Sequence, residues 1–218
     1  MAPLQFGVIM IPFQLMDVVG PIDILSSCSK PYLSGFGNAE LADRGIDIEF
    51  HFIGDETATH PTGFQSQPTT TLSACPKLDY LLIGGPSPEY IKNIPPAIAS
   101  FVRERAAEVK TVFTTCTGGI FASALGLLDG LNATTNHEAI AIAKEIGPKV
   151  KWTAERNWIV DGKFWTAGGA CAGMDMMAHW TMENYDKDIA EAGFAVLAYE
   201  PRDVTTIGNF WQDPSIFA

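Results

Sequence analysis

Cysteine and histidine are scarce in this sequence, and neither shows the close spacing that marks a metal or redox site. The four cysteines, Cys28, Cys75, Cys116 and Cys171, lie far apart, and no C-x-x-C occurs. The four histidines form no H-x-x-x-H or H-E-x-x-H pair. Zinc sites and disulfide frameworks can usually be recognised in a sequence by such spacing. We therefore expect reduced thiols and no metal.

Long apolar runs and clusters of basic residues are also missing. The run 6–13 is far shorter than the roughly 20 residues that cross a membrane. No basic residue precedes it and no cleavage site follows, so we expect no secretory signal and a cytoplasmic protein. Lysine and arginine number 14 against 25 acidic residues, a formal net charge of −11. This balance argues against nucleic acid or an anionic membrane as partner.

Apolar residues, by contrast, make up 47% of the chain, enough for a large core. We expect one domain over residues 1–218, with its core at about 4–200 and a C-terminal tail at 201–218. Period-2 or continuous apolar runs predict strands, and apolar residues at helical spacing predict helices. The predicted strands are 4–11, 46–52, 78–83, 111–115 and 131–134, then a hairpin of 158–160 and 164–166 across a type I′ turn at Asp161-Gly162. The predicted helices are 17–28, 95–109, 119–128, 138–146, 172–184 and 188–199, and 57–71 is predicted as a hairpin or loop. This alternation predicts an α/β sandwich with a mostly parallel sheet.

The stretch from Thr111 to Phe121 carries the strongest chemical signal. A strand of β-branched and aromatic residues runs into Cys116, and Thr117, two glycines and an Ala/Leu-rich helix follow. A residue on such a strand-to-helix turn is exposed at the carboxyl edge of the sheet, where open α/β folds bind ligands. The start of a helix also favours a thiolate. The pattern therefore predicts that Cys116 is a nucleophile, whereas Cys28 and Cys75 are expected to be buried and to serve packing alone.

Four separated motifs resemble those of the ThiJ/PfpI superfamily, a group related to class I glutamine amidotransferases. They are Phe6–Pro12 with Met16–Pro21, then Leu81–Gly85, then Cys116–Gly119 with Ala133–Thr135, and finally Phe164–Asp175. The resemblance implies a flavodoxin-like sandwich, a nucleophile-elbow cysteine at position 116, no cofactor and a homodimer.

Within the superfamily the sequence is most similar to the isonitrile hydratase branch. That branch carries an aspartate in an Asp-x-x-Gly-Pro motif, which here begins at Asp17, and a threonine after the cysteine, here Thr117. Peptidase-like members carry histidine directly after the cysteine, and the position that often holds a histidine downstream is here Asn136. The resemblance implies a small-molecule substrate and a lyase that adds water to an isonitrile and releases an N-substituted formamide.

The remaining site predictions concern residues around the cysteine. Asp17 is expected to donate a proton to the adduct and to share a proton with the thiol, although aspartate is also a preferred helix N-cap. The N–H groups of Gly85 and Thr117 are expected to hold developing negative charge or to position a water. Ala170 and Cys171 are expected near the active site, where Cys171 is interpreted first as a packed small residue.

Two other functions stay open at this level. The same fold and cysteine would serve another lyase or hydrolase that acts on a specialised metabolite or a dicarbonyl. A non-catalytic redox or ligand-sensing module is the third interpretation, because fold likeness alone does not fix function.

Overall fold

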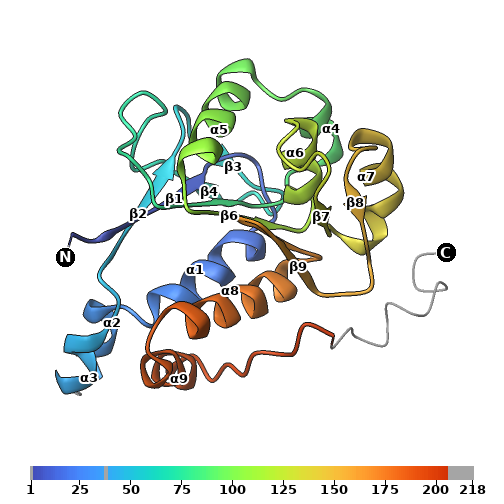
Figure 1. The fold of residues 1–218 in the computed structure, drawn as a ribbon. Helices are drawn as coiled ribbons and strands as arrows, with labels where there is room; N and C mark the ends of the chain where they lie inside the picture. Colours follow the sequence, from blue (N-terminus) through green and yellow to red (C-terminus); the bar gives the residue numbers. More distant parts are fainter. Residues whose placement is uncertain (1, 37–38, 206–218) are drawn as a thin grey trace.

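A six-stranded sheet with helices on both faces organises the chain (Figure 1). The computed structural model describes residues 2–36 and 39–205. The sheet order is β2-β1-β5-β6-β10-β9, and every neighbouring pair is parallel except β10 with β9. The strands are β1 (Leu4–Ile9), β2 (Ile48–Ile53), β5 (Tyr80–Ile83), β6 (Thr111–Thr115), β9 (Trp158–Asp161) and β10 (Phe164–Ala167). The predicted α/β class with a mostly parallel sheet is confirmed.

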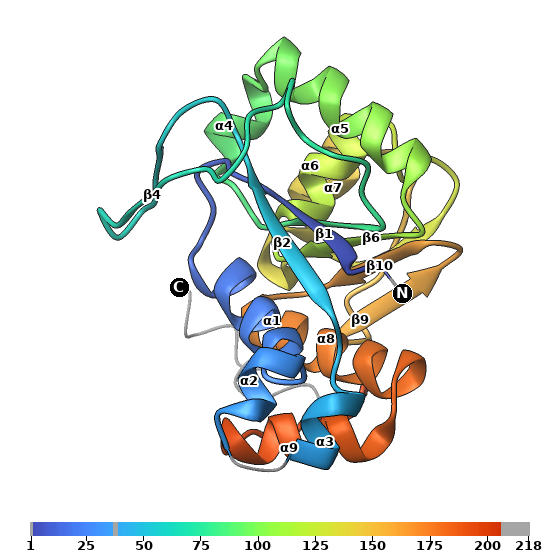
Figure 2. The same cartoon turned by 90° about the vertical axis from the view of Figure 1, so that its left-hand side faces the viewer.

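The helices form two layers, as Figures 1 and 2 show from perpendicular directions. One layer holds α4 (Pro88–Lys92), α5 (Pro96–Glu108), α6 (Gly118–Ala124) and α7 (Ile140–Ile146). The other holds α1 (Met16–Ser26), α8 (Ala170–Asn184) and α9 (Lys187–Val196), with α2 (Lys30–Ser34) and α3 (Ala39–Arg44) at its end. No helix in the described part of the chain is both long and apolar enough to cross a membrane.

Two small pairings lie outside the main sheet. The segment predicted as a hairpin or loop holds β3 (Ala58–Thr59) and β4 (Gln65–Ser66), which pair antiparallel and project from the molecule (Figure 2). The short strand predicted near residue 132 is β7 (Asn132–Ala133), and it pairs with β8 (Lys151–Trp152) rather than with the main sheet.

The hairpin between β9 and β10 corrects one prediction. Asp161 pairs with Phe164, so the two central turn residues are Gly162 and Lys163. A type I′ turn needs a positive φ at both central residues, but only Gly162, at 59°, has one. A type I′ turn at Asp161-Gly162 is therefore wrong, and the turn has a positive φ only at its first central position, where glycine stands.

An aromatic cluster forms the centre of the core. Phe6 of β1 stacks on Phe113 of β6, with ring centroids 6.0 Å apart. Trp180 of α8 approaches Phe113 edge-on at 5.2 Å and Tyr80 at 4.9 Å. Such edge-to-face contacts stabilise a core beyond the area that they bury. They fix α8 against the sheet, and α8 carries one wall of the site described next.

The parallel strands β1, β5, β6 and β10 all end at one edge of the sheet. The segments that follow them therefore converge there, as expected for an open parallel sheet. These segments lead from β1 into α1, from β5 into α4, from β6 into α6, and from β10 into α8.

Candidate functional site

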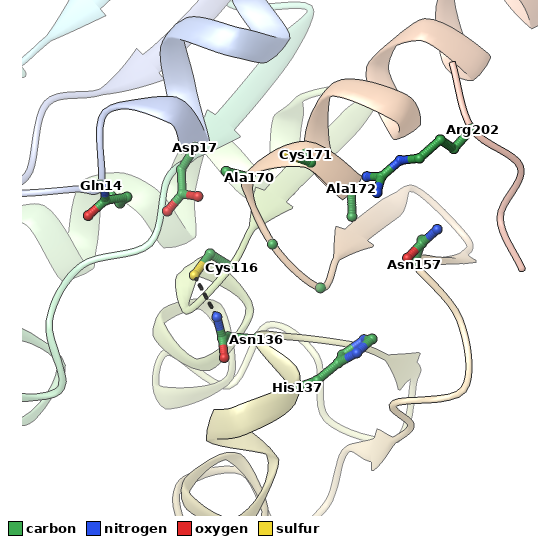
Figure 3. Close-up of a pocket in the computed structure, with 12 residues that line it drawn as sticks. Gln14, Asp17, Cys116, Asn136, His137, Asn157, Ala170, Cys171, Ala172 and Arg202 are labelled. Carbon is green, nitrogen blue, oxygen red and sulfur yellow. Dashed lines mark hydrogen bonds between the residues drawn. The ribbon is translucent and has the colours of Figure 1, made fainter. Parts of the chain in front are cut away.

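A cavity of about 320 Å³ opens at this edge of the sheet. Residues of α1 and α8 and of the segments between elements line it, and Figure 3 shows Asp17 and Cys116 on one side and Arg202 on the other. Its lining residues are Gln14, Asp17, Cys116, Asn136, His137, Asn157, Gly168, Gly169, Ala170, Cys171, Ala172 and Arg202. The sequence-predicted residues Asp17, Cys116, Ala170 and Cys171 therefore lie together, although distant parts of the chain supply them.

Cys116 occupies the turn between β6 and α6 in a strained backbone conformation. Its φ is 54°, and among the described non-glycine residues only Ala198 shares a positive φ. A non-glycine residue in this region costs about 1–3 kcal/mol, which the surrounding structure must offset. The Cys116 N–H donates to the Ala167 carbonyl at 3.0 Å, and the Thr135 hydroxyl donates to the Cys116 carbonyl at 2.7 Å. These two bonds hold the cysteine in the turn.

The start of α6 must be glycine for steric reasons. A Cβ at Gly118 would lie 2.4 Å from the carbonyl oxygen of Ile83, the last residue of β5. Backbone atoms cannot give way as a flexible side chain can, so glycine lets α6 begin directly beside β5. Cys116 is thereby brought next to the segment that carries Gly85.

The Asp17 carboxyl is fully buried and lies in the first turn of α1. Its Oδ2 accepts a 3.1 Å hydrogen bond from the Gly85 N–H, and its Oδ1 has no partner among the described residues. The N-cap of α1 is Leu15, and no side chain caps the helix. The interpretation of Asp17 as a helix cap is therefore wrong, because its carboxyl points across to the β5 segment.

Burial dominates the proton affinities of Asp17 and Cys116. Burial raises the pKa of Asp17 to about 7, and contacts with the Gly85 N–H and the Cys116 thiol oppose this rise. Burial, and then the nearby Asp17 carboxylate, raise the pKa of Cys116 above its ordinary value. The start of the helix favours the thiolate, as predicted, but burial and Asp17 outweigh it, so the pKa of Cys116 is raised and not lowered. Two adjacent acids that disfavour each other's ionised form titrate as a coupled pair.

Three groups act in the opposite direction on the thiol. The Asn136 amide donates to Cys116 Sγ at 3.4 Å, and the N–H and hydroxyl of Thr117 also lower the pKa of Cys116. The Thr117 hydroxyl itself donates to the Pro86 carbonyl at 2.7 Å. Hydrogen bonds of this kind favour the thiolate once it forms.

Gly85 packs its backbone against the Asp17 carboxyl and Thr117, beside Cys116. A Cβ here would be 2.6 Å from Thr117 Oγ1 and 2.8 Å from Asp17 Oδ2, so no larger residue fits. Its N–H is bound to Asp17 in the structure. A role for the Gly85 and Thr117 N–H groups in holding negative charge stays a prediction.

The four cysteines differ sharply in environment. Cys28 and Cys75 are buried, as predicted, and burial raises the pKa of Cys28 to about 11. Cys171, in the first turn of α8, is exposed and lines the cavity beside Ala170. Its interpretation as a packed residue is therefore wrong, because the first turn of α8 faces the cavity rather than the core.

Sequence reasoning missed several lining residues. The sequence marks Asn136 only as a replacement for histidine, and its one local signal is that of a cap, since its side chain accepts from the Glu138 N–H. His137 lies beside it, with Nε2 3.3 Å from the Arg156 carbonyl, and burial lowers its pKa. Gln14 precedes α1, and its N–H donates to the Gly85 carbonyl at 3.1 Å.

The segment that follows α9 contributes Arg202 to the lining of the cavity. The predicted tail 201–218 is described to residue 205, and residues 206–218 lie outside the described residues. Within it, the Asp203 carbonyl accepts from the Asn157 side chain at 3.1 Å, and the Val204 carbonyl accepts from the Asn157 N–H at 2.9 Å. These bonds fasten the segment beside β9 and place Arg202 in the cavity lining. Within 2–36 and 39–205, no three His, Cys, Asp or Glu side chains cluster in a way that could hold a metal ion.

Comparison with known proteins gives a consistent result. Residues 8–183 match the DJ-1/PfpI family. An isonitrile hydratase of Pseudomonas putida is 30% identical over 202 residues, which cover 91% of this chain and 79% of that protein. The HTH-type transcriptional regulator GbdR of Pseudomonas aeruginosa is 25% identical over 139 residues, 63% of this chain but 37% of the regulator. Among solved structures, a ThiJ/PfpI family protein from Pseudomonas syringae superposes with a TM-score of 0.79 at 21% identity, covering 100% of this chain and 84% of that one.

Proposed function

This chain belongs to the DJ-1/PfpI family, and from that premise we propose that it is a cofactor-free cysteine enzyme that hydrates isonitriles. The observation that carries the proposal is the pairing of Cys116 with a buried Asp17 whose pKa is raised to about 7. A carboxyl that keeps its proton beside a nucleophile is suited to general acid catalysis. The 30% identity to an isonitrile hydratase supports this choice of substrate.

The proposed reaction uses two stages at one carbon. The Cys116 thiolate attacks the terminal carbon of R–N≡C, and Asp17 delivers its proton to that carbon, which gives the thioimidate R–N=CH–S–Cys116. Water then adds to the same carbon while the nitrogen takes up a proton. The C–S bond breaks, R–NH–CHO leaves, and one proton returns to the Cys116–Asp17 pair. The sum is isonitrile plus water to formamide, with no change in the enzyme.

The surrounding residues have defined tasks in this scheme. The Asn136 amide and the Thr117 N–H stabilise the thiolate in the ground state and again when it leaves. The Gly85 N–H holds Asp17 Oδ2, so the proton is directed to Oδ1, the oxygen without a partner among the described residues. The lining residues Ala170 and Cys171 bound the space for the substituent R.

The test follows formamide production from an alkyl isonitrile. We expect the wild type to form the formamide and Cys116→Ser to lose this activity. Cys75→Ser is the matched control, because Cys75 is buried away from the cavity and serine can keep its bond to the Pro76 carbonyl. Absence of formamide from the folded wild type would contradict the proposal.

A sensing role is the second candidate, supported by the likeness to part of a transcriptional regulator. Such a module would bind a small molecule in the same cavity without turnover. The formamide assay separates the two functions, since a sensor would give saturable binding but no product. The resemblance also predicts a homodimer, which remains a prediction for sedimentation measurements.

A further inference from the structure

Arg202 brings a permanent positive charge to the cavity, across from Cys116 (Figure 3). Of the described residues that line the cavity, it alone carries one at neutral pH, because burial lowers the pKa of His137 and keeps that ring neutral. The Arg202 side chain is 39% exposed, so a ligand in the cavity can reach it. The reaction proposed above does not use this charge.

The guanidinium is held in place by a buried carboxylate behind it. Asp175 of α8 is 1% exposed, and its Oδ2 lies 2.8 Å from Arg202 Nε and 2.6 Å from Nη2. Asp175 Oδ1 accepts from the Arg202 N–H at 3.0 Å and from the Tyr199 hydroxyl. Arginine has five N–H donors in a fixed plane, and this side-on pairing engages only the Nε and Nη2 edge. No other acceptor among the described residues engages the remaining donors, so an acceptor in the cavity can bind them.

Arg202 lines the cavity, whereas Asp175 does not. An anion in the cavity would therefore meet the positive end of this ion pair first. The first turn of α8 also favours an anion in the cavity. Ala170, Cys171 and Ala172 line the cavity, and Gly169 gives the helix no side-chain cap. The N–H groups of a first turn have no partner within the helix and favour negative charge.

We propose that Arg202 is a specificity-determining residue that selects isonitriles carrying a carboxylate on the substituent. This inference rests on the proposed function and adds the class of substrate to it. The isonitrile carbon would lie at Cys116 and the carboxylate at Arg202, so the two groups of one small molecule would span the cavity. A carboxylate suits the free edge of a guanidinium, because the two planar groups share two hydrogen bonds.

The kinetic test compares potassium isocyanoacetate with its neutral methyl ester. We expect the wild type to have a higher kcat/KM for the carboxylate. Arg202→Gln should lower kcat/KM for the carboxylate by about 10- to 100-fold, the range for a hydrogen bond to a charged group, and leave the ester nearly unchanged. Arg202→Lys keeps the charge but loses the two parallel N–H donors of the guanidinium, so it should retain part of the preference for the carboxylate.

Tyr199→Phe is the matched control for structure. It removes one donor to Asp175, and so loosens the same anchor, without changing the charge in the cavity. We expect it to keep the preference for the carboxylate. If Tyr199→Phe abolishes the preference for the carboxylate, or if Arg202→Gln lowers kcat/KM equally for carboxylate and ester, Arg202 is only a structural anchor and the proposal fails.

A binding measurement separates this inference from the proposed activity. Calorimetry on Cys116→Ser compares N-formylglycinate with N-formylglycine methyl ester. Tighter binding of the carboxylate, lost in the Cys116→Ser/Arg202→Gln double variant, would support the role of Arg202 even if no isonitrile were turned over. Equal affinity for the two compounds would overturn it even if hydratase activity were present.

Discussion

The Thr115 hydroxyl donates a 2.7 Å hydrogen bond to the backbone carbonyl of Asp17. In an α-helix that carbonyl would accept from the N–H four residues on, but position 21 is proline and has no N–H. The last residue of β6 therefore supplies the donor that α1 lacks. The same bond sets the carboxyl of Asp17 against Cys116, the residue after Thr115.

This hydrogen bond predicts that a substitution at Pro21 compensates for the loss of the Thr115 hydroxyl. Thr115→Val keeps the side-chain shape but leaves a buried carbonyl without its donor, which should cost about 1–3 kcal/mol of stability and lower turnover. Pro21→Ala restores an N–H at the position where a helix provides one. The double variant should therefore be more stable than Thr115→Val alone, as measured by urea unfolding. Additive effects of the two changes would show that the carbonyl does not depend on Thr115.

The second prediction concerns the proton on Asp17. Asp17→Asn keeps an oxygen that can accept from Gly85 but removes the transferable proton, so turnover should fall by about 10²-fold or more. Asp17→Ala should lose as much turnover and also the bond from Gly85. Since Asp17 does not cap α1, circular dichroism should show equal helix content in both variants. Near wild-type turnover by Asp17→Asn would remove the acid from the mechanism.

A third prediction is a pH dependence of stability. The pKa of Asp17 rises from 3.8 to about 7 on folding, so between these values the folded protein holds a proton that the unfolded chain has lost. Folding then takes up a proton, and stability falls as pH rises from about 4 to about 7. Asp17→Asn removes this penalty. Its free energy of unfolding should rise relative to that of the wild type over this interval, by on the order of 4 kcal/mol at pH 8. The check is the free energy of unfolding of both proteins, measured at several pH values. A difference between them that stays constant from pH 4 to pH 8 would contradict the raised pKa.

The fourth prediction distinguishes the thiols by alkylation. Cys116 and Cys171 face the cavity or solvent, so a small reagent should label them in the folded protein, with Cys28 and Cys75 protected until unfolding. Asp17→Asn should change the rate at Cys116 and not at Cys171, because only Cys116 is coupled to the Asp17 charge. Peptide mapping by mass spectrometry gives both rates from one sample. A rate at Cys116 that is insensitive to Asp17 would contradict the coupling.

Sequence periodicity predicted the elements that are buried and long. The strand 111–115 was predicted with its observed ends, because all five residues are buried and four are β-branched. The short helices α2, α3 and α4 were missed, since five or six residues hold too few turns to show a period. A signal for two of them was present: Ser29 and Ser87 cap α2 and α4, and a proline follows within two residues in each case.

The site was predicted where one local motif carries its chemistry, and missed where contacts across the fold create it. Cys116 and Asp17 stand in recognisable local patterns. Arg202 has no pattern of its own. Its bonds to Asp175, and those of Asn157 to Asp203 and Val204, bring it to the cavity, and both Asp175 and Asn157 are distant from it in the sequence. The pKa of Cys116 was misjudged for the same reason, because burial outweighs the start of a helix and burial depends on the whole fold.

Because of its positive φ, position 116 favours different residues for activity and for stability. Activity requires cysteine, whereas the folded chain would be more stable, and so more abundant, with glycine. Glycine adopts this conformation without strain, so Cys116→Gly relieves a cost that every other side chain bears. A screen that scores expression alone would enrich glycine at position 116, and a screen that scores turnover would eliminate it. Opposite fitness ranks at one position, from two assays of the same library, identify a residue whose strain persists for the sake of its chemistry.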